Sequence, residues 1–260
     1  MSTKTMQGQL WSIAPKYWSK HFEPYFLPMY RKVMEQIHLT EDTLLLDAGC
    51  GSGLFSHMAI NSGAQVIGID AAPGLLEIAR QRNPLNNFLE EDLEALPFSD
   101  NSFNVVTGFN SFQYAGRFEN ALSEAKRVLK KYGRIVLGIW DKPENSDATV
   151  ILKAISTLLP PPPPGTPGPF ALSEDGRIED ICTSQDLKVI YKTTIACPIL
   201  FHSKADAVKS FMSTGPAAMA LHIHDQKTVE KVISDAFDQF HHTEDIYFLQ
   251  NNFLVFIAEK

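Results

Sequence analysis

The feature that most constrains this chain is a glycine-rich turn at residues 47–53, which reads Asp-Ala-Gly-Cys-Gly-Ser-Gly. The turn follows an apolar run at residues 44–46, which is typical of a strand buried on both faces of a parallel sheet. A helical pattern begins at Leu54. Glycine permits a sharp turn and lets a ligand touch the backbone. The turn therefore predicts a ligand site at the carboxyl end of a strand, the usual place in open α/β sheets.

Strand and helix patterns alternate from this turn to residue 140. We expect strands at residues 65–70, around 88–89, around 105–106 and at 134–140, and helices that begin at residues 54, 73 and 118. The last of these helices is expected to end at Lys131, before the stop at Gly133. Such alternation requires crossover connections and predicts a parallel sheet.

The pattern changes in the second half of the chain. Residues 187–195 alternate as a half-buried strand does, and residues 246–258 are expected to form one closing strand. We interpret the two as an antiparallel edge on the sheet, with a helical insertion at residues 204–242 above its ligand end. The five prolines at residues 160–164 are expected to form a rigid loop at the rim of a substrate pocket, or else a polyproline II ligand for a recognition domain.

Two acidic residues follow predicted strands. The Asp70 carboxylate ends the second strand, where it can accept hydrogen bonds from both hydroxyls of a ribose; alternatively it caps the helix entered at Pro73. Asp92 follows the third strand and can accept from an exocyclic amino group. A dinucleotide fingerprint is disfavoured, because its third glycine would fall on Leu54. The turn is therefore better suited to a ligand without a phosphate.

Residues 44–72 followed by 91–106 resemble the class I S-adenosylmethionine-dependent methyltransferases, in particular the small-molecule group that includes quinone-biosynthesis enzymes. The resemblance covers about the first half of the chain. It implies an α/β fold with a Rossmann-like, mostly parallel seven-stranded sheet, an antiparallel C-terminal edge strand, helices on both faces, and helical lid elements near both termini. The expected layout is a single domain with an N-terminal cap (1–38), a cofactor-binding core (39–145), a proline-rich loop and helix (146–186), and edge strands carrying the lid insertion (187–260).

The resemblance also implies a cofactor, S-adenosyl-L-methionine, and a role for each matching residue. The glycine turn would hold its methionine part, Asp70 the ribose, Asp92 and Leu93 the adenine, and the loop at Phe109, Asn110 and Gln113 the sulfonium end. The implied cofactor-binding residues are Asp47, Gly49, Cys50, Gly51, Gly53, Asp70, Ala71, Asp92, Leu93, Asn110 and Gln113.

Two departures from the family pattern bear on the substrate. Asn104 stands where many members have aspartate, at a position expected to be structural. Residues 110–112 read Asn-Ser-Phe and lack the Pro-Pro of enzymes that methylate adenine or glutamine amide nitrogens, which disfavours those substrates.

No catalytic residue is identified by sequence. Transfer from an activated methyl often needs only alignment and exclusion of water, although a hydroxyl acceptor requires a general base. Candidate bases are His202, His222 and Tyr114, with His224, His241 and His242 behind them; each histidine alone is more typical of packing or surface. No metal site is expected. Trp11, Tyr17 and Trp18 are expected either to form a flap over the cofactor or simply to pack on the domain.

The net charge and the cysteine content limit the kinds of partner that we expect. The net charge of −7 disfavours a nucleic-acid partner, and three widely spaced cysteines indicate reduced thiols. No signal peptide or membrane span is expected, so we predict a cytoplasmic monomer or homodimer that acts on a small-molecule methyl acceptor. The alternatives are a catalytically silent S-adenosylmethionine-binding protein or subunit partner and, less favoured, a nicotinamide-dependent oxidoreductase.

Overall fold

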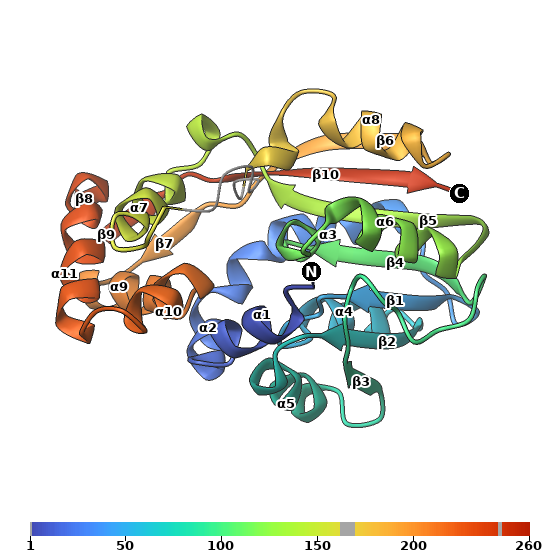
Figure 1. Cartoon of the computed structure of the whole chain (residues 1–260), viewed down its shortest axis with the longest axis horizontal. Helices are drawn as coiled ribbons and strands as arrows, with labels where there is room; N and C mark the ends of the chain where they lie inside the picture. Colours follow the sequence, from blue (N-terminus) through green and yellow to red (C-terminus); the bar gives the residue numbers. More distant parts are fainter. Residues whose placement is uncertain (1, 162–169, 244–245) are drawn as a thin grey trace.

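The computed structural model describes residues 2–161, 170–243 and 246–260, which build a central sheet with helices around it (Figure 1). The sheet has seven strands in the order β3-β2-β1-β4-β5-β10-β6. Their bounds are β1 (Leu44–Ala48), β2 (Gln65–Asp70), β3 (Asn87–Glu90), β4 (Phe103–Phe109), β5 (Leu129–Trp140), β6 (Lys188–Ala196) and β10 (Asn252–Glu259). The predicted seven-stranded, mostly parallel sheet is confirmed.

The C-terminal strand is antiparallel, as predicted, but it lies one place in from the edge. Strand β10 pairs antiparallel with β5 on one side and with β6 on the other, so β6 is the edge strand. Burial explains this order: residues 253–258 of β10 are all buried, whereas β6 alternates between exposed and partly buried side chains. An apolar run fits an interior strand, and an alternating one fits an edge.

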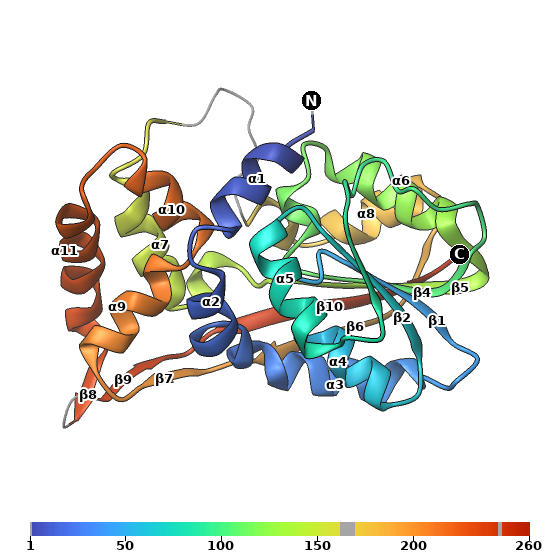
Figure 2. The ribbon, with the colours of Figure 1, turned by 90° about the horizontal axis from the view of Figure 1, so that it is seen from below.

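Helices cover both faces of the sheet, as Figure 2 shows from below. Adjacent residues of β1 point to opposite faces, with Leu45 in one apolar cluster and Leu46 in the other. Helices α3 and α4 pack in the first cluster, and α6 and α8 in the second. The α-helices are α1 (Lys4–Trp11), α2 (Pro15–His21), α3 (Leu27–Ile37), α4 (Leu54–Asn61), α5 (Pro73–Arg82), α6 (Phe118–Val128), α7 (Ala148–Ser156), α8 (Arg177–Ser184), α9 (Lys204–Met212), α10 (Gly215–Leu221) and α11 (Gln226–Phe237).

Short 3-10 helices connect these elements. They are η1 (Glu23–Phe26), η2 (Phe112–Tyr114), η3 (Pro143–Asn145), η4 (Ala171–Ser173) and η5 (Asp238–Phe240). The five-proline run extends into residues 162–169, which lie outside the described residues, so its place at a pocket rim stays a prediction. Within residues 2–161, 170–243 and 246–260, no helix combines the length and apolarity needed to cross a bilayer.

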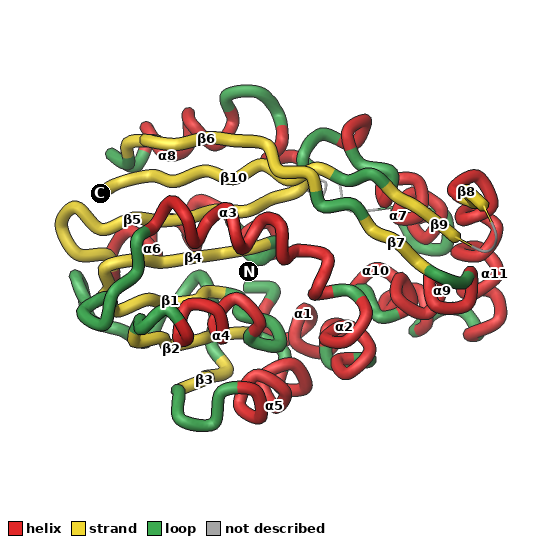
Figure 3. The backbone as a smooth tube through the Cα atoms, turned by 180° about the vertical axis from the view of Figure 1, so that it is seen from behind, coloured by secondary structure: helices red, strands yellow, loops and turns green. Residues whose placement is uncertain are grey.

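Helices α9, α10 and α11 fall within the predicted insertion and pack with α7 beyond the carboxyl ends of the parallel strands, beside α1 and α2 (Figure 1). A second, three-stranded sheet lies beside them (Figure 3), formed by β7 (Ile199–Phe201), β9 (Ile246–Leu249) and β8 (His241–Thr243). The sequence patterns did not predict this sheet.

The single closing strand predicted at residues 246–258 is wrong, because the segment divides between the two sheets as β9 and β10. The break falls at Asn251, a fully buried residue whose side-chain oxygen accepts from the Ala148 backbone N–H at 2.9 Å. Its own carbonyl accepts from the Cys197 N–H at 2.7 Å. These contacts take Asn251 out of the strand pattern and turn the chain from one sheet to the other.

The sequence predicted that this helix ends at Lys131, but helix α6 ends at Val128. The next residue, Leu129, is extended (φ −70°, ψ 136°) and pairs with Phe103 as the first residue of β5. Sheet pairing therefore overrides the helical pattern of the last three residues.

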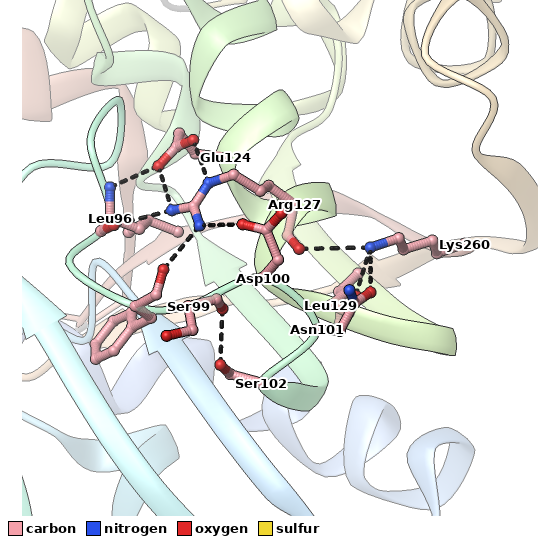
Figure 4. A network of polar contacts seen from close by, with 10 residues as sticks. Leu96, Ser99, Asp100, Asn101, Ser102, Glu124, Arg127, Leu129 and Lys260 are labelled. Atoms are coloured by element: carbon pink, nitrogen blue, oxygen red, sulfur yellow. Dashed lines mark hydrogen bonds and ion pairs between the residues drawn. The ribbon is translucent and has the colours of Figure 1, made fainter.

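A polar network fixes the loop that follows Asp92 to helix α6 (Figure 4). The Arg127 guanidinium donates to the Glu124 and Asp100 carboxylates at 2.7 to 2.8 Å, and to the Leu96 and Phe98 carbonyls at 2.9 and 2.7 Å. Lys260 extends the network by donating to Asn101 Oδ1 at 2.9 Å and to the Leu129 carbonyl at 2.6 Å. The network anchors residues 96–101 and so supports the loop that carries Asp92.

Candidate active site

The glycine turn lies where β1 meets α4, and all three of its glycines have positive φ, at 82°, 55° and 76°. Two of them are required by packing. A Cβ at Gly49 would lie 2.1 Å from the Ser111 Cβ, and one at Gly53 would lie 3.0 Å from the Ala79 Cβ. At Gly51, by contrast, the nearest atom would be Glu23 Oε1 at 3.6 Å. A side chain at Gly51 would therefore make only ordinary contacts, whereas Gly49 and Gly53 bring elements of the protein close together.

Asp70 connects the glycine turn to the loop after β2. Its carboxylate oxygens accept from the backbone N–H groups of Gly51 and Ala72, each at 2.8 Å. The alternative role as a helix cap is not observed, because the N-cap of α5 is Ala72 and no side chain caps that helix. Burial raises the pKa of Asp70, with the backbone N–H groups opposing the shift. The Ala71 N–H is a third backbone donor to this carboxylate. A carboxylate has about four acceptor sites, so about one remains for a further donor.

Asn110 and Gln113 supply buried polar atoms without a protein partner. Asn110 follows β4 with φ +49°, and its side-chain oxygen accepts from Gln113 Nε2 at 3.1 Å. In the part of the chain that the structure describes, Asn110 Nδ2 and Gln113 Oε1 are buried and make no hydrogen bond. An unpaired buried polar group costs about 1–3 kcal/mol. A free donor and a free acceptor at this loop therefore indicate a place for a polar ligand.

The loop that carries Asp92 lies beside Asp70, since the Glu91 N–H donates to the Asp70 carbonyl at 3.1 Å. Asp92 Oδ1 accepts from the Glu94 N–H at 2.9 Å, and Oδ2 accepts from the Ser2 hydroxyl. Leu93 is partly buried against the apolar cluster under α6. Nearby, a cavity of about 410 Å³ lies between α1 and the ends of β2 and β3, with Gly8, Ala71 and Glu90 in its wall.

Two of the three predicted flap residues lie together. Trp11 packs edge-on against Trp18 and Tyr114, with ring centroids 4.9 and 5.7 Å away, and Trp18 stacks on Phe22 at 4.7 Å. The Thr3 hydroxyl also donates to the Tyr114 carbonyl at 2.5 Å. The aromatic contact of Tyr17 is with His21, on its own helix. Trp11 and Trp18 thus connect the N-terminal helices to the loop after β4.

The structure separates the candidate bases. His202 and His222 are exposed on the C-terminal insertion, whereas Tyr114 lies at the loop after β4. Burial raises the pKa of Tyr114 to about 12, so its phenol stays protonated at neutral pH and is suited to donate a hydrogen bond. Among the described residues there is no cluster of three or more histidine, cysteine or acidic side chains arranged for a metal.

Cys50 and Asp47 have buried side chains. The Cys50 thiol packs with Leu76 and Phe88, so only its backbone belongs to the turn. All three cysteines are buried free thiols. Asp47 is 1% exposed, and its oxygens accept from the Ser56 hydroxyl at 2.5 Å and the Thr107 hydroxyl at 3.0 Å. Asp47 therefore supports the turn from below by joining β1 to α4 and β4.

Asp47 gives a testable pH dependence. Burial raises its pKa to about 6, above the ordinary value of 3.8, so the folded state binds this proton more tightly than the unfolded state. Its contribution to the free energy of unfolding therefore falls as pH rises from about 4 to 6, by about 1.4 kcal/mol per unit of pKa difference. As pH rises from about 4 to about 7, we expect the free energy of unfolding of Asp47→Asn to increase relative to that of the wild type, because only the wild type loses the contribution of this proton. Urea unfolding of both proteins measures the difference, and a constant gap across this range would contradict the assignment.

Sequence reasoning missed one acidic residue at the site, Glu23. It begins η1, is 3% exposed, and accepts from Arg82 Nη1 at 2.8 Å and from the Ser52 hydroxyl. Ser19 completes the group, accepting from Ser52 at 2.9 Å and from Arg82 at 3.0 Å. In the sequence, Glu23 is a single acidic residue within an aromatic segment, and this pattern does not indicate what the residue contacts.

Part of the chain is similar to known methyltransferases. Residues 46–137 match the family model described as a methyltransferase domain. The malonyl-[acyl-carrier protein] O-methyltransferase of Serratia marcescens is 38% identical over 92 residues, covering 35% of this chain and 36% of that protein. The demethylmenaquinone methyltransferase of Renibacterium salmoninarum is 31% identical over 113 residues, covering 44% and 48%. The chain thus spans between about a third and a half of these relatives' length.

Solved structures agree on the fold. A SAM-dependent methyltransferase from Aquifex aeolicus superimposes with a TM-score of 0.53 at 19% identity, covering 70% of this chain and 93% of that one. Together the comparisons confirm the resemblance indicated by the glycine turn and the acidic residues that follow β2 and β3.

Proposed function

We propose that this chain, which carries a methyltransferase domain at residues 46–137 and resembles the class I S-adenosylmethionine-dependent methyltransferases, transfers a methyl group from S-adenosyl-L-methionine to a small-molecule acceptor. The observation that carries the proposal is the pair of unpaired buried atoms, Asn110 Nδ2 and Gln113 Oε1, on the loop that packs against Gly49. Gly49 of the turn lies against Ser111, the residue after Asn110, and the Asp70 carboxylate accepts from the Gly51 N–H.

These residues match the parts of the cofactor in order. The backbone at Gly51 would hold the methionine part, the Asp70 carboxylate the ribose hydroxyls, and Asp92 with Leu93 and Ala71 the adenine. Asn110 and Gln113 would lie at the sulfonium end. The carboxylates of Asp47, which is buried, and Asp70 suit a ligand that carries positive charge.

When bound, the cofactor supplies a methyl group on a positive sulfonium; an acceptor electron pair forms the new bond while the C–S pair returns to sulfur. The protein aligns the two reactants in line and excludes water. Trp11, Trp18 and Tyr114 close the site from the N-terminal side, and we assign the insertion at residues 204–242 as the lid over the acceptor. A hydroxyl acceptor would lose its proton to a base, which Tyr114 does not provide because its phenol is protonated.

The acceptor is proposed to be a small molecule or a small group on a carrier, since the relatives are named for malonyl-[acyl-carrier protein] and for demethylmenaquinone. The net charge of −7 argues against nucleic acid. Buried free thiols are consistent with action in the cytoplasm. We expect a monomer or a homodimer.

A methyl-transfer assay distinguishes an enzyme from a protein that binds the cofactor without catalysis. The protein would be incubated with methyl-labelled S-adenosylmethionine and a panel that includes a malonyl thioester and a demethylated quinol, and the label and S-adenosylhomocysteine would be quantified together. We expect transfer to one acceptor, with equal amounts of both products. Cofactor binding without transfer to any acceptor would instead favour the catalytically silent binding protein.

A further inference from the structure

Two polar groups from the N-terminal segment converge on the open side of Gly51. From the position that a Cβ would take there, Glu23 Oε1 lies 3.6 Å away and Trp18 Nε1 lies 3.9 Å away. Glu23 is 3% exposed, and Trp18 is partly buried against the core. A carboxylate oxygen and an indole N–H therefore border the same small space beside the turn.

The two oxygens of Glu23 have different surroundings. Oε2 accepts from both Arg82 and the Ser52 hydroxyl, and these contacts connect η1 to the glycine turn and to α5. Oε1 is used by neither of these side chains and is the oxygen nearest Gly51. The ion pair with Arg82 accounts for Oε2, and the Leu54 N–H at the start of α4 is a further backbone donor to the Glu23 carboxylate. Oε1 nonetheless lies beside Gly51, the glycine of the turn whose added Cβ would make only ordinary contacts.

The polar groups beside Gly51 suit an amino acid. Glu23 is buried and pairs at 2.8 Å with Arg82, whose side chain is 22% exposed. Glu23 Oε1 and the Trp18 N–H lie on the same side of Gly51. A zwitterion adds no net charge, and its ammonium matches a carboxylate oxygen while its carboxylate matches an N–H donor.

We propose that Glu23 Oε1 accepts a hydrogen bond from the α-ammonium of the cofactor's amino-acid end, and that the Trp18 indole N–H donates to its α-carboxylate. This inference rests on the proposed function and adds two cofactor-binding residues to it. Trp18 then has a second role besides closing the site, and Arg82 positions the Glu23 carboxylate.

A pair of ligands tests the proposal. S-adenosylhomocysteine and 5′-methylthioadenosine share the adenosine and the thioether, but only the first carries the amino-acid end. Calorimetry would measure the affinity of both ligands for the wild type and for Glu23→Gln. We expect the variant to bind S-adenosylhomocysteine at least about tenfold more weakly, the loss of one charge-assisted hydrogen bond, and 5′-methylthioadenosine within about twofold of the wild type.

Two further variants keep the test decisive. Trp18→Phe keeps an aromatic ring and removes the N–H, so we expect a selective loss for S-adenosylhomocysteine of about fivefold. Arg82→Gln keeps the Glu23 carboxylate but removes the side chain that positions it, so we expect a selective loss for S-adenosylhomocysteine that is smaller than in Glu23→Gln, with 5′-methylthioadenosine within about twofold of the wild type. If Glu23→Gln does not fold, the selectivity of Trp18→Phe decides.

Equal losses for both ligands in Glu23→Gln, or no loss at all, would overturn the proposal. Failure of the folded wild type to bind either ligand is a different result, because it contradicts the proposed function itself.

Discussion

Gly51→Ala is expected to weaken S-adenosylhomocysteine binding about tenfold to 100-fold, while the protein stays folded. The backbone at Gly51 has φ +55°, so alanine costs about 1–2 kcal/mol of conformational strain. Its methyl group would meet no protein atom closer than 3.6 Å. The methyl would instead occupy the space that we assign to the ligand, so binding is expected to suffer more than stability. Calorimetric titration and urea unfolding would measure the two effects separately.

The neighbouring glycines provide the matched controls. In Gly49→Ala the new Cβ would lie 2.1 Å from the Ser111 Cβ, and in Gly53→Ala it would lie 3.0 Å from the Ala79 Cβ. Both variants are expected to lose more stability than Gly51→Ala, because the clash is with the protein itself. If Gly51→Ala instead loses as much stability as Gly49→Ala and its folded fraction binds normally, then Gly51 is a packing residue and the ligand is elsewhere.

Asp70→Asn is expected to weaken S-adenosylhomocysteine and 5′-methylthioadenosine binding by the same factor, about tenfold to 100-fold. Both ligands carry the ribose, and a hydrogen bond to a charged carboxylate contributes about 1.5–3 kcal/mol. The variant is also expected to be somewhat less stable, because an amide NH₂ replaces one of the oxygens that accept from the Gly51 and Ala72 N–H groups. Thermal unfolding gives this cost independently of binding.

For Asp70→Asn we expect weaker binding of both ligands, whereas for Glu23→Gln we expect weaker binding only of S-adenosylhomocysteine, the ligand that carries an amino-acid end. Asp235→Asn serves as the control, since its carboxylate is 60% exposed and pairs with Lys231 on the same helix, α11. This control is expected to leave both affinities unchanged. A loss in Asp70→Asn confined to S-adenosylhomocysteine would place Asp70 at the amino-acid end and contradict the ribose assignment.

The sequence predicted the parallel half of the sheet well, because each buried strand there is a short apolar run followed by a turn and a helix. Pairing between distant strands was harder to predict. The position of β10 between β5 and β6 depends on contacts of residues 252–259 with residues 134–140 and 188–196, which no local pattern contains. The division of residues 246–258 also depends on a single buried side chain, Asn251.

Some residues of the candidate site could likewise be predicted from the sequence, and others could not. Asp70 was predictable because it ends a strand next to the glycine turn, and the structure places its carboxylate against Gly51. Glu23 was not predictable, because it lies 28 residues before Gly51 in the sequence and reaches the turn only when the fold brings η1 against Ser52 of the turn and Arg82 of α5. Exposure, which the sequence does not reveal, distinguishes His202 and His222 from the partly buried Tyr114.

The central claim is that the glycine turn, Asp70 and the Asn110 loop bind S-adenosylmethionine. Its most direct test is calorimetric titration of the folded wild-type protein with S-adenosylhomocysteine, with NAD as the competing ligand class. We predict saturable binding of one S-adenosylhomocysteine per chain and no binding of NAD. A protein that is folded by circular dichroism and yet binds no S-adenosylhomocysteine, or binds NAD in its place, would contradict the claim.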